Sequence, residues 1–174
     1  MLAVNGSLEW SLVPYYALGQ ILGAMVGAFL AWAAFKQLFD ANNVDDAGNT
    51  TGANATTGGI FFTNPAHPNN GWNAVTEFIA TCVLLMFIAF GPTGGELGPL
   101  SYFGVAFVVV AVGLSLGTPT GYAINPVRDL GPRLMYAFVL PIKDKGTANW
   151  SYAWVPVVAP LLAAVAVGLL SMAL

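Results

Sequence analysis

Residues 117–133 read Gly-Thr-Pro-Thr-Gly-Tyr-Ala-Ile-Asn-Pro-Val-Arg-Asp-Leu-Gly-Pro-Arg, and apolar runs long enough to cross a bilayer lie on both sides of them. The segment is broken by glycine and proline and carries two arginines. Lipid cannot satisfy the polar groups of irregular backbone, so such a segment persists at membrane depth only where it is buried in protein or lines a wet cavity. Arg128 supports the same interpretation, because an intramembrane charge usually faces water or a partner. The segment therefore predicts a polar path inside a membrane protein.

The local pattern predicts a short helix in the middle of this path. Asn125 is a favoured N-cap residue, and Pro126 suits the first helical position, where no N–H is needed. The helix is expected to run to about Leu140, which is short of the roughly 20 residues of a full crossing. Residues 118–124 precede two prolines and are expected to be extended, with a row of carbonyl oxygens. Carbonyl acceptors that end at helix amides and at Arg128 would suit small uncharged solutes and repel cations.

Simpler explanations exist for each part of this pattern. Asn-Pro is a common turn dipeptide. An arginine near the end of an apolar segment often extends to the lipid headgroups. We favour a pore because the short helix, the Gly/Pro-rich approach and the adjacent Arg128 and Asp129 occur together between two crossings.

The stretch from Gly121 to Arg133 resembles the second signature loop of the aquaporin superfamily, whose usual form is Asn-Pro-Ala-Arg. The aspartate that follows the arginine, Asp129, makes this loop resemble that of the glycerol-conducting branch of the family, the aquaglyceroporins or glycerol uptake facilitators. The order of spans agrees with this family from about Trp10 to the C-terminus. Two features depart from the family pattern. Val127 replaces the usual alanine, and the family has two such loops whereas this chain contains one.

The composition places the chain in the membrane class, since 57% of its residues are hydrophobic and 7% are charged. The net charge of −3 is thinly spread, so no nucleic-acid partner is expected. Cys82 is the single cysteine and His67 the single histidine, which excludes an intrachain disulfide and offers no metal cluster. We therefore predict no cofactor, no metal site and no enzyme activity.

Hydropathy predicts an all-α membrane protein with four crossings and one re-entrant half-helix, and the resemblance implies an aquaporin-like right-handed helical bundle. We expect residues 1–174 to form a single but partial channel domain in the cell membrane, with a polar turn at 141–150. The crossings are expected at Trp10 to about Leu38, Trp72 to about Phe90, Leu100 to Gly117, and Trp154 to Leu174.

A polar segment at about 40–71 separates the first two crossings and is expected outside the bilayer. It contains Asn64-Pro65-Ala66, which spells the motif that the family repeats. We predict that this copy forms no half-helix, because the proline and glycine of residues 67–71 break any helix immediately. The resemblance places the segment on the external side. Three lysines on that side would favour the cytoplasm by the positive-inside rule, but so few charges carry less weight than the resemblance.

The resemblance also implies which residues line the pore. Arg128 supplies donors and repels cations, Tyr122 takes a place usually held by phenylalanine in glycerol channels, and Gly113 matches a position where water-only channels carry histidine. Asn125 would donate at the pore centre. The fourth filter position lies on a span that this chain does not contain. The backbone carbonyls that would accept solute hydroxyls belong to Gly121, Tyr122, Ala123 and Ile124.

Three further residues are expected to support the pore loop. The resemblance implies that Glu77, on the second crossing, holds the backbone of the signature loop. A carboxylate that accepts N–H groups there would orient the carbonyls toward the pore. Asp129 is expected to stabilise the helix end and the loop, and Pro126 begins the helix.

These expectations predict passive, selective diffusion of a glycerol-like polyol or water, and the resemblance implies a homotetramer embedded in membrane lipid. Two alternatives stay open. The chain is expected to begin just after the first half-helix, with Met1 an internal start, and would then be a truncated, non-conducting fragment of such a channel. A secondary transporter also uses broken helices; its ionisable groups would reduce to Glu77 and the Arg128–Asp129 pair, and its flux would depend on an ion gradient.

Overall fold

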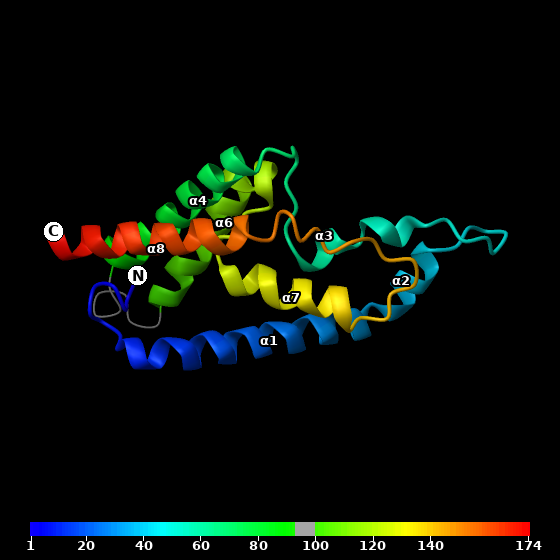
Figure 1. The fold of residues 1–174 in the computed structure, drawn as a ribbon, viewed down its shortest axis with the longest axis horizontal. Helices are drawn as coiled ribbons and strands as arrows, with labels where there is room; N and C mark the ends of the chain where they lie inside the picture. Colours follow the sequence, from blue (N-terminus) through cyan, green and yellow to red (C-terminus); the bar gives the residue numbers. More distant parts are fainter. Residues whose placement is uncertain (93–99) are drawn as a thin grey trace.

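The protein is described here by a computed structural model that covers residues 1–92 and 100–174 in detail. In these residues the chain is helical, and its only strand-like feature is one isolated antiparallel bridge between Val44 and Thr50. Figure 1 shows the helices in chain order: η1 Trp10–Leu12, α1 Val13–Ala34, α2 Lys36–Asn42, η2 Ala53–Thr56, α3 Gly58–Phe61, α4 Asn70–Phe90, α6 Ser101–Thr120, α7 Pro126–Phe138 and α8 Val155–Ala173.

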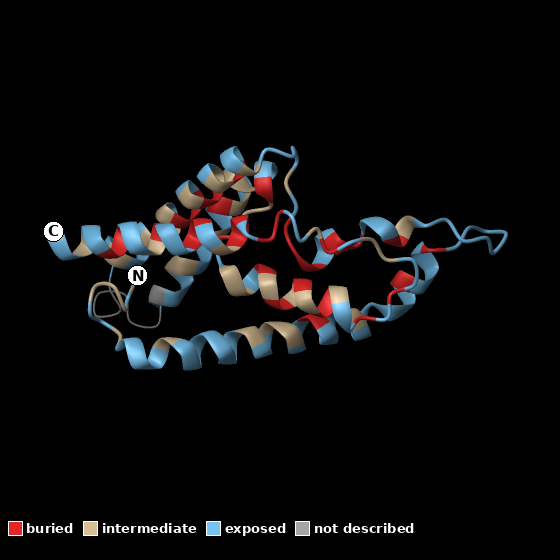
Figure 2. Cartoon of the chain, viewed as in Figure 1, coloured by how far each residue is buried: buried red, intermediate tan, exposed pale blue. Residues whose placement is uncertain are grey.

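Four stretches are long and apolar enough to cross a membrane: Trp10–Ala34, Asn70–Phe90, Tyr102–Thr120 and Val155–Ala173. Their outward faces are exposed and apolar, as Figure 2 shows most clearly along α1. The four predicted crossings are therefore present. One boundary was wrong: the first helix ends at Ala34, because Phe35 leaves helical geometry (φ −107°, ψ 13°), and α2 then begins at Lys36.

The half-length helix α7 lies between α1 and α8, while α4 packs against both α8 and α6. Figure 1 shows α7 beginning about half way along the bundle and ending at the side of the long loop. Its 13 residues give a length of about 20 Å, compared with about 30 Å for the hydrocarbon core of a bilayer. Helix α6 ends beside Ala66 of the long loop, and α7 starts about half way along the bundle and runs back to the side of that loop, as a re-entrant segment does.

A glycine sets the distance between α7 and α1. A Cβ built on Gly131 would lie 2.8 Å from the Cβ of Ala24 and 3.3 Å from the carbonyl oxygen of Ile21. Both distances are shorter than ordinary contacts, so only glycine fits at this position without movement. Small residues commonly allow such close approach of membrane helices.

The long loop between α1 and α4 is folded against the bundle. Phe61 and Phe62 are buried and pack their rings against Tyr136 of α7. No helix begins at Asn64-Pro65-Ala66: residues 63–69 are not helical, and the next helix, α4, begins at Asn70. The prediction that this motif forms no second half-helix is confirmed. Instead, the amide of Ala66 donates to the carbonyl oxygen of Pro119 (2.9 Å), which ties the loop to the end of α6.

Candidate functional site

The half-helix α7 starts as its sequence predicts. Asn125 is extended (φ −158°, ψ 119°), and its Oδ1 accepts hydrogen bonds from the backbone amides of Val127 (2.9 Å) and Arg128 (3.3 Å). Pro126 occupies the first helical position. Because Oδ1 is engaged in the cap, the side-chain NH₂ of Asn125 is the group that can donate to a solute. The positive end of the α7 dipole lies at the same point.

The segment before Asn125 differs from the extended strand that we expected for residues 118–124. Helix α6 continues through Thr120 with Pro119 inside its last turn, so the expectation was wrong for residues 118–120. The residue before Pro119 is helical in spite of the bias against helix at that position, and the carbonyl oxygen of Pro119 accepts from the amide of Ala66 (2.9 Å). Beyond the helix, φ is positive at three residues: Gly121 (79°), Tyr122 (41°) and Ile124 (45°). This conformation is costly for residues other than glycine, so the surroundings must hold it.

Glu77 of α4 holds this backbone. Its carboxylate is fully buried, and it accepts hydrogen bonds from the amide of Ala123 through Oε1 (2.9 Å) and from the amide of Ile124 through Oε2 (2.8 Å). Successive amides of an extended strand point to opposite sides, whereas these two point to the same carboxylate. The positive φ values at Tyr122 and Ile124 accompany this departure. The contact expected for Glu77 is therefore present, although the segment that it holds is not a regular strand.

The orientation of the carbonyl groups follows from these two hydrogen bonds. In a planar trans peptide, the N–H and the C=O point in opposite directions. Since the amides of Ala123 and Ile124 face Glu77, the carbonyls of the same peptide units, which belong to Tyr122 and Ala123, face away from it. Two acceptors are thus presented in succession on the side opposite α4.

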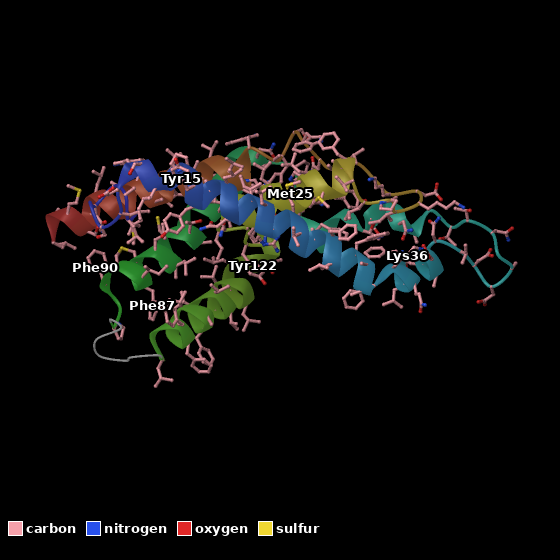
Figure 3. All side chains as sticks on the ribbon, turned by 90° about the horizontal axis from the view of Figure 1, so that it is seen from below. Tyr15, Met25, Lys36, Phe87, Phe90 and Tyr122 are labelled. Carbon is pink, nitrogen blue, oxygen red and sulfur yellow. The ribbon has the colours of Figure 1, made fainter. Side chains whose placement is uncertain are left out.

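Tyr122 and Gly113 are brought together by the fold. A Cβ built on Gly113 would lie 2.9 Å from Cζ of Tyr122, and one built on Gly117 would lie 2.9 Å from its Cδ1. The tyrosine ring therefore lies across a face of α6 from which side chains are missing. Figure 3 shows Tyr122 beside α6, close to the start of α7. Tyr122 is half-buried, so part of the residue is accessible.

Arg128 lies on the first turn of α7 and is exposed, as is Asn125. In the described part of the chain its guanidinium makes no ion pair. Both the cap residue and this charge are therefore solvent-accessible at the start of α7.

Asp129 was expected to stabilise the helix end and the loop. Its carboxylate accepts from Nε (2.7 Å) and Nη2 (3.0 Å) of Arg133, one helical turn further on. It also accepts from the backbone amide (2.8 Å) and the hydroxyl (2.6 Å) of Thr63 in the long loop. Both charged side chains are fully buried. Asp129 thus joins the loop to α7 directly, and its ion pair with Arg133 accompanies this link.

Sequence reasoning missed Arg133 as a site residue. Its guanidinium donates to the backbone carbonyls of Thr63 (2.9 Å), Ala148 (2.5 Å) and Asn149 (3.1 Å), and it stacks 4.2 Å from the ring centroid of Phe62. These hydrogen bonds link α7 to the long loop before α4 and to the segment between α7 and α8. The spacing of Asp129 and Arg133, four residues apart on a helix, was the available signal.

Lys145 closes the other end of the half-helix. Its ammonium group donates to the carbonyl oxygens of Tyr136 (2.5 Å) and Leu140 (2.7 Å) in and just beyond the last turn of α7. Partial burial lowers the pKa of Lys145 from its usual value. A cation at a helix C-terminus interacts favourably with the dipole. Both ends of α7 are therefore stabilised, by Asn125 at the start and by Lys145 at the end.

Comparison with known proteins places this geometry in a family. The model of the family described as "Major intrinsic protein" matches residues 1–171. This chain belongs to the major intrinsic protein family. The family match, together with the four helices long and apolar enough to span a membrane, confirms the predicted all-α membrane fold class and the multi-pass membrane location.

Several members of the family are similar along nearly the whole chain. The "Glycerol uptake facilitator protein" of Streptococcus pneumoniae is 42% identical over 163 residues, which are 93% of this chain and 65% of that protein. The protein of the same name from Bacillus subtilis is 43% identical over 162 residues, 92% of this chain and 55% of that protein. The X-ray structure of the aquaglyceroporin from Plasmodium falciparum matches with a TM-score of 0.77 at 25% identity, over 97% of this chain and 66% of that one. The chain thus spans roughly two thirds or less of these relatives.

Proposed function

We propose that this chain provides one half-helix and one carbonyl ladder of a passive channel for glycerol, other small uncharged solutes and water. The similarity to glycerol uptake facilitators supports the substrate class. As part of the same proposal, residues 1–174 act as a single channel domain, and the protein assembles as a homotetramer in membrane lipid.

The observation that carries the proposal is the pair of hydrogen bonds from Ala123 and Ile124 to Glu77. Because the amides face Glu77, the carbonyls of Tyr122 and Ala123 point away from it, and we assign them the role of accepting hydroxyl groups from a solute. The backbone of Gly121 and Ile124 extends this row at either end. A solute would exchange part of its water shell for these fixed acceptors as it passes.

The selectivity of the channel is assigned to the residues around this row. Arg128 donates to a solute oxygen and repels cations, with the positive end of α7 adding to the repulsion. Asn125 donates through its side-chain NH₂. The ring of Tyr122 offers an apolar surface for the carbon atoms of a polyol, and Gly113 provides the space that lets this ring lie back against α6.

The test is uptake of glycerol by lipid vesicles that contain the chain, followed by light scattering. We expect faster entry than in protein-free vesicles, with no dependence on a proton or sodium gradient. Replacing Gly113 with histidine should displace the ring of Tyr122 into the path and reduce glycerol entry more than water entry. Arg128→Ala should increase leakage of protons, measured with an enclosed pH-sensitive dye, while Lys143→Ala at an exposed position should not.

Folding and conduction can be separated in this assay. Slow hydrogen exchange at the amides of Ala123 and Ile124 would report that the pore loop is formed. A chain with protected amides and no glycerol entry would contradict the proposal and favour the non-conducting fragment. Entry driven by an ion gradient would favour the secondary transporter instead.

A further inference from the structure

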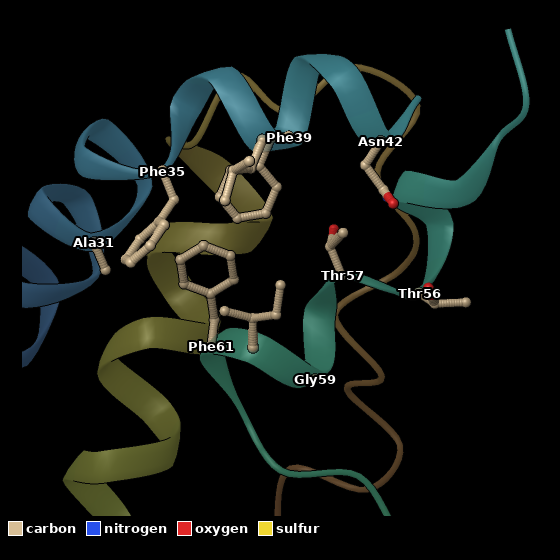
Figure 4. Close-up of a pocket in the computed structure, with 10 residues that line it drawn as sticks. Ala31, Phe35, Phe39, Asn42, Thr56, Thr57, Gly59 and Phe61 are labelled. Atoms are coloured by element: carbon tan, nitrogen blue, oxygen red, sulfur yellow. The ribbon is translucent and has the colours of Figure 1, made fainter. Parts of the chain in front are cut away.

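A groove of about 580 Å³ lies where the end of α1 and α2 face the short helix α3. Figure 4 shows the rings of Phe35, Phe39 and Phe61 gathered at its centre, with Ala31 at the end that adjoins α1. The groove spans the break at Phe35 between α1 and α2, where the first crossing ends. The rings of Phe39 and Phe61 stack with centroids 5.8 Å apart and form the floor.

The walls of the groove are apolar and unusually exposed for a connection between helices. Leu38 and Ile60 are each 65% exposed, and Phe35 is 57% exposed. Ile60 belongs to a four-residue helix in the segment that the sequence predicted to lie outside the bilayer. None of the described residues that line the groove is charged. Such a surface is unfavourable in bulk water, so its occupant should be apolar.

The groove is continuous with the lipid-facing surface of the molecule and changes in polarity along its length. Its inner end begins at Ala31 on the membrane-spanning helix α1, where the adjacent Leu30 is 59% exposed. Its outer end is rimmed by the polar side chains of Asn42 and Thr56 (Figure 4). The apolar end of the groove, toward the bilayer, suits the hydrocarbon tail of a lipid. The polar end suits the ester group that joins this tail to the headgroup.

We propose that this groove binds an acyl chain of a membrane phospholipid, with the tail along Phe35, Phe39 and Phe61 and the ester end near Asn42 and Thr56. The groove has the size of a small-ligand site. Binding draws α3 to the level of the acyl chains, so that this part of the long loop is a membrane contact. The inference depends on the membrane location of α1 and is independent of the proposed solute path.

Fluorescence quenching by brominated lipid tests this placement. The chain is prepared with Cys82→Ala and a single new cysteine that carries a fluorophore, in vesicles of phosphatidylcholine with bromine on the acyl chains. A probe at Ile60→Cys should be quenched as strongly as one at Leu30→Cys on the lipid face of α1. A probe at Asp46→Cys, in the exposed tip of the loop, should not be quenched.

A variant that fills the groove provides the second arm. A Cβ on Gly59 has nothing within 4 Å, so Gly59→Leu adds bulk without a backbone clash. We expect quenching at Ile60 to fall to the level of the Asp46 probe, and mass spectrometry of the intact protein to show one retained phospholipid fewer. The matched control is Gly23→Leu, which also enters open space but lies away from the groove.

Three results would overturn the proposal. The first is an unquenched probe at Ile60 beside a quenched probe at Leu30. The second is a lipid count that Gly59→Leu leaves unchanged in a folded chain. The third is a probe at Ile60 that is not quenched by brominated lipid but transfers energy to the Ile60 probe of another molecule. That result would identify a second copy of the chain as the occupant.

Discussion

The ring of Tyr122 occupies the space that a side chain at position 113 would need, since a Cβ built on Gly113 would lie 2.9 Å from Cζ of Tyr122. The two residues belong to different parts of the chain, a membrane-spanning helix and the irregular loop that follows it. A side chain at position 113 would therefore have to displace the ring of Tyr122.

This relationship predicts strong coupling between substitutions at the two positions. In the Tyr122→Ala background, Gly113→Ala should stabilise the protein by about 0.5–1 kcal/mol, because alanine favours helix. With Tyr122 present, the added methyl group overpacks the contact, so the coupling free energy should be about 1–3 kcal/mol. Reversible unfolding in detergent measures both values. Gly23→Ala, which enters open space, is the control and should not couple with Tyr122→Ala.

Replacing Glu77 with glutamine should loosen the pore loop. Glutamine has one oxygen, so its NH₂ group would face either the amide of Ala123 or that of Ile124, and one buried donor would lose its acceptor. The expected loss of stability is about 1–3 kcal/mol, with faster hydrogen exchange at one or both amides. Glu9→Gln, at an exposed position, should change neither quantity. Unchanged exchange at both amides in Glu77→Gln would show that other contacts hold the loop.

The buried pair of Asp129 and Arg133 should respond very differently from the exposed pair of Lys36 and Asp40, which has the same spacing of four residues. Arg133→Met leaves a buried carboxylate without its counter-charge and should cost about 3–5 kcal/mol. Lys36→Met should cost less than about 1 kcal/mol. Unfolding in detergent, with each variant compared at low and high salt, measures both.

A double variant separates the charge of this pair from its packing. Adding Asp129→Asn to Arg133→Met removes the unpaired charge, so the double variant should be more stable than Arg133→Met alone. If the double variant is less stable than Arg133→Met, the hydrogen bonds from Thr63 to Asp129 contribute more than the ion pair does.

Lys145→Met should fray the end of α7. The substitution keeps the apolar stem but removes charge-assisted hydrogen bonds to the carbonyls of Tyr136 and Leu140, at a cost of about 1.5–3 kcal/mol. Hydrogen exchange at the amides of Val139 and Leu140 should become faster, since both donate to Met135 in this turn. Lys143→Met, at an exposed position two residues away, is the matched control. Equal exchange in the two variants would contradict the capping role.

Sequence patterns predicted the helices and the start of α7 well, because these features depend on neighbouring residues. Apolar runs gave the four crossings to within a few residues, and Asn125-Pro126 gave the N-cap. The same reasoning failed at Thr118–Thr120, where the local effect of proline predicted extended backbone and the structure has helix. It also failed at Phe35, where the helix breaks between α1 and α2 although the sequence has no glycine or proline there.

The sequence by itself thus determined that this is a membrane protein with four crossings and a half-helix, since hydropathy and capping act over a few residues. Only the tertiary structure decided which groups meet across the chain. Glu77 holds the amide of Ile124, 47 residues away, and Arg133 reaches the carbonyl of Thr63, 70 residues away. Residues this far apart meet only when the helices pack, because buried charges and unpaired amides must find partners there.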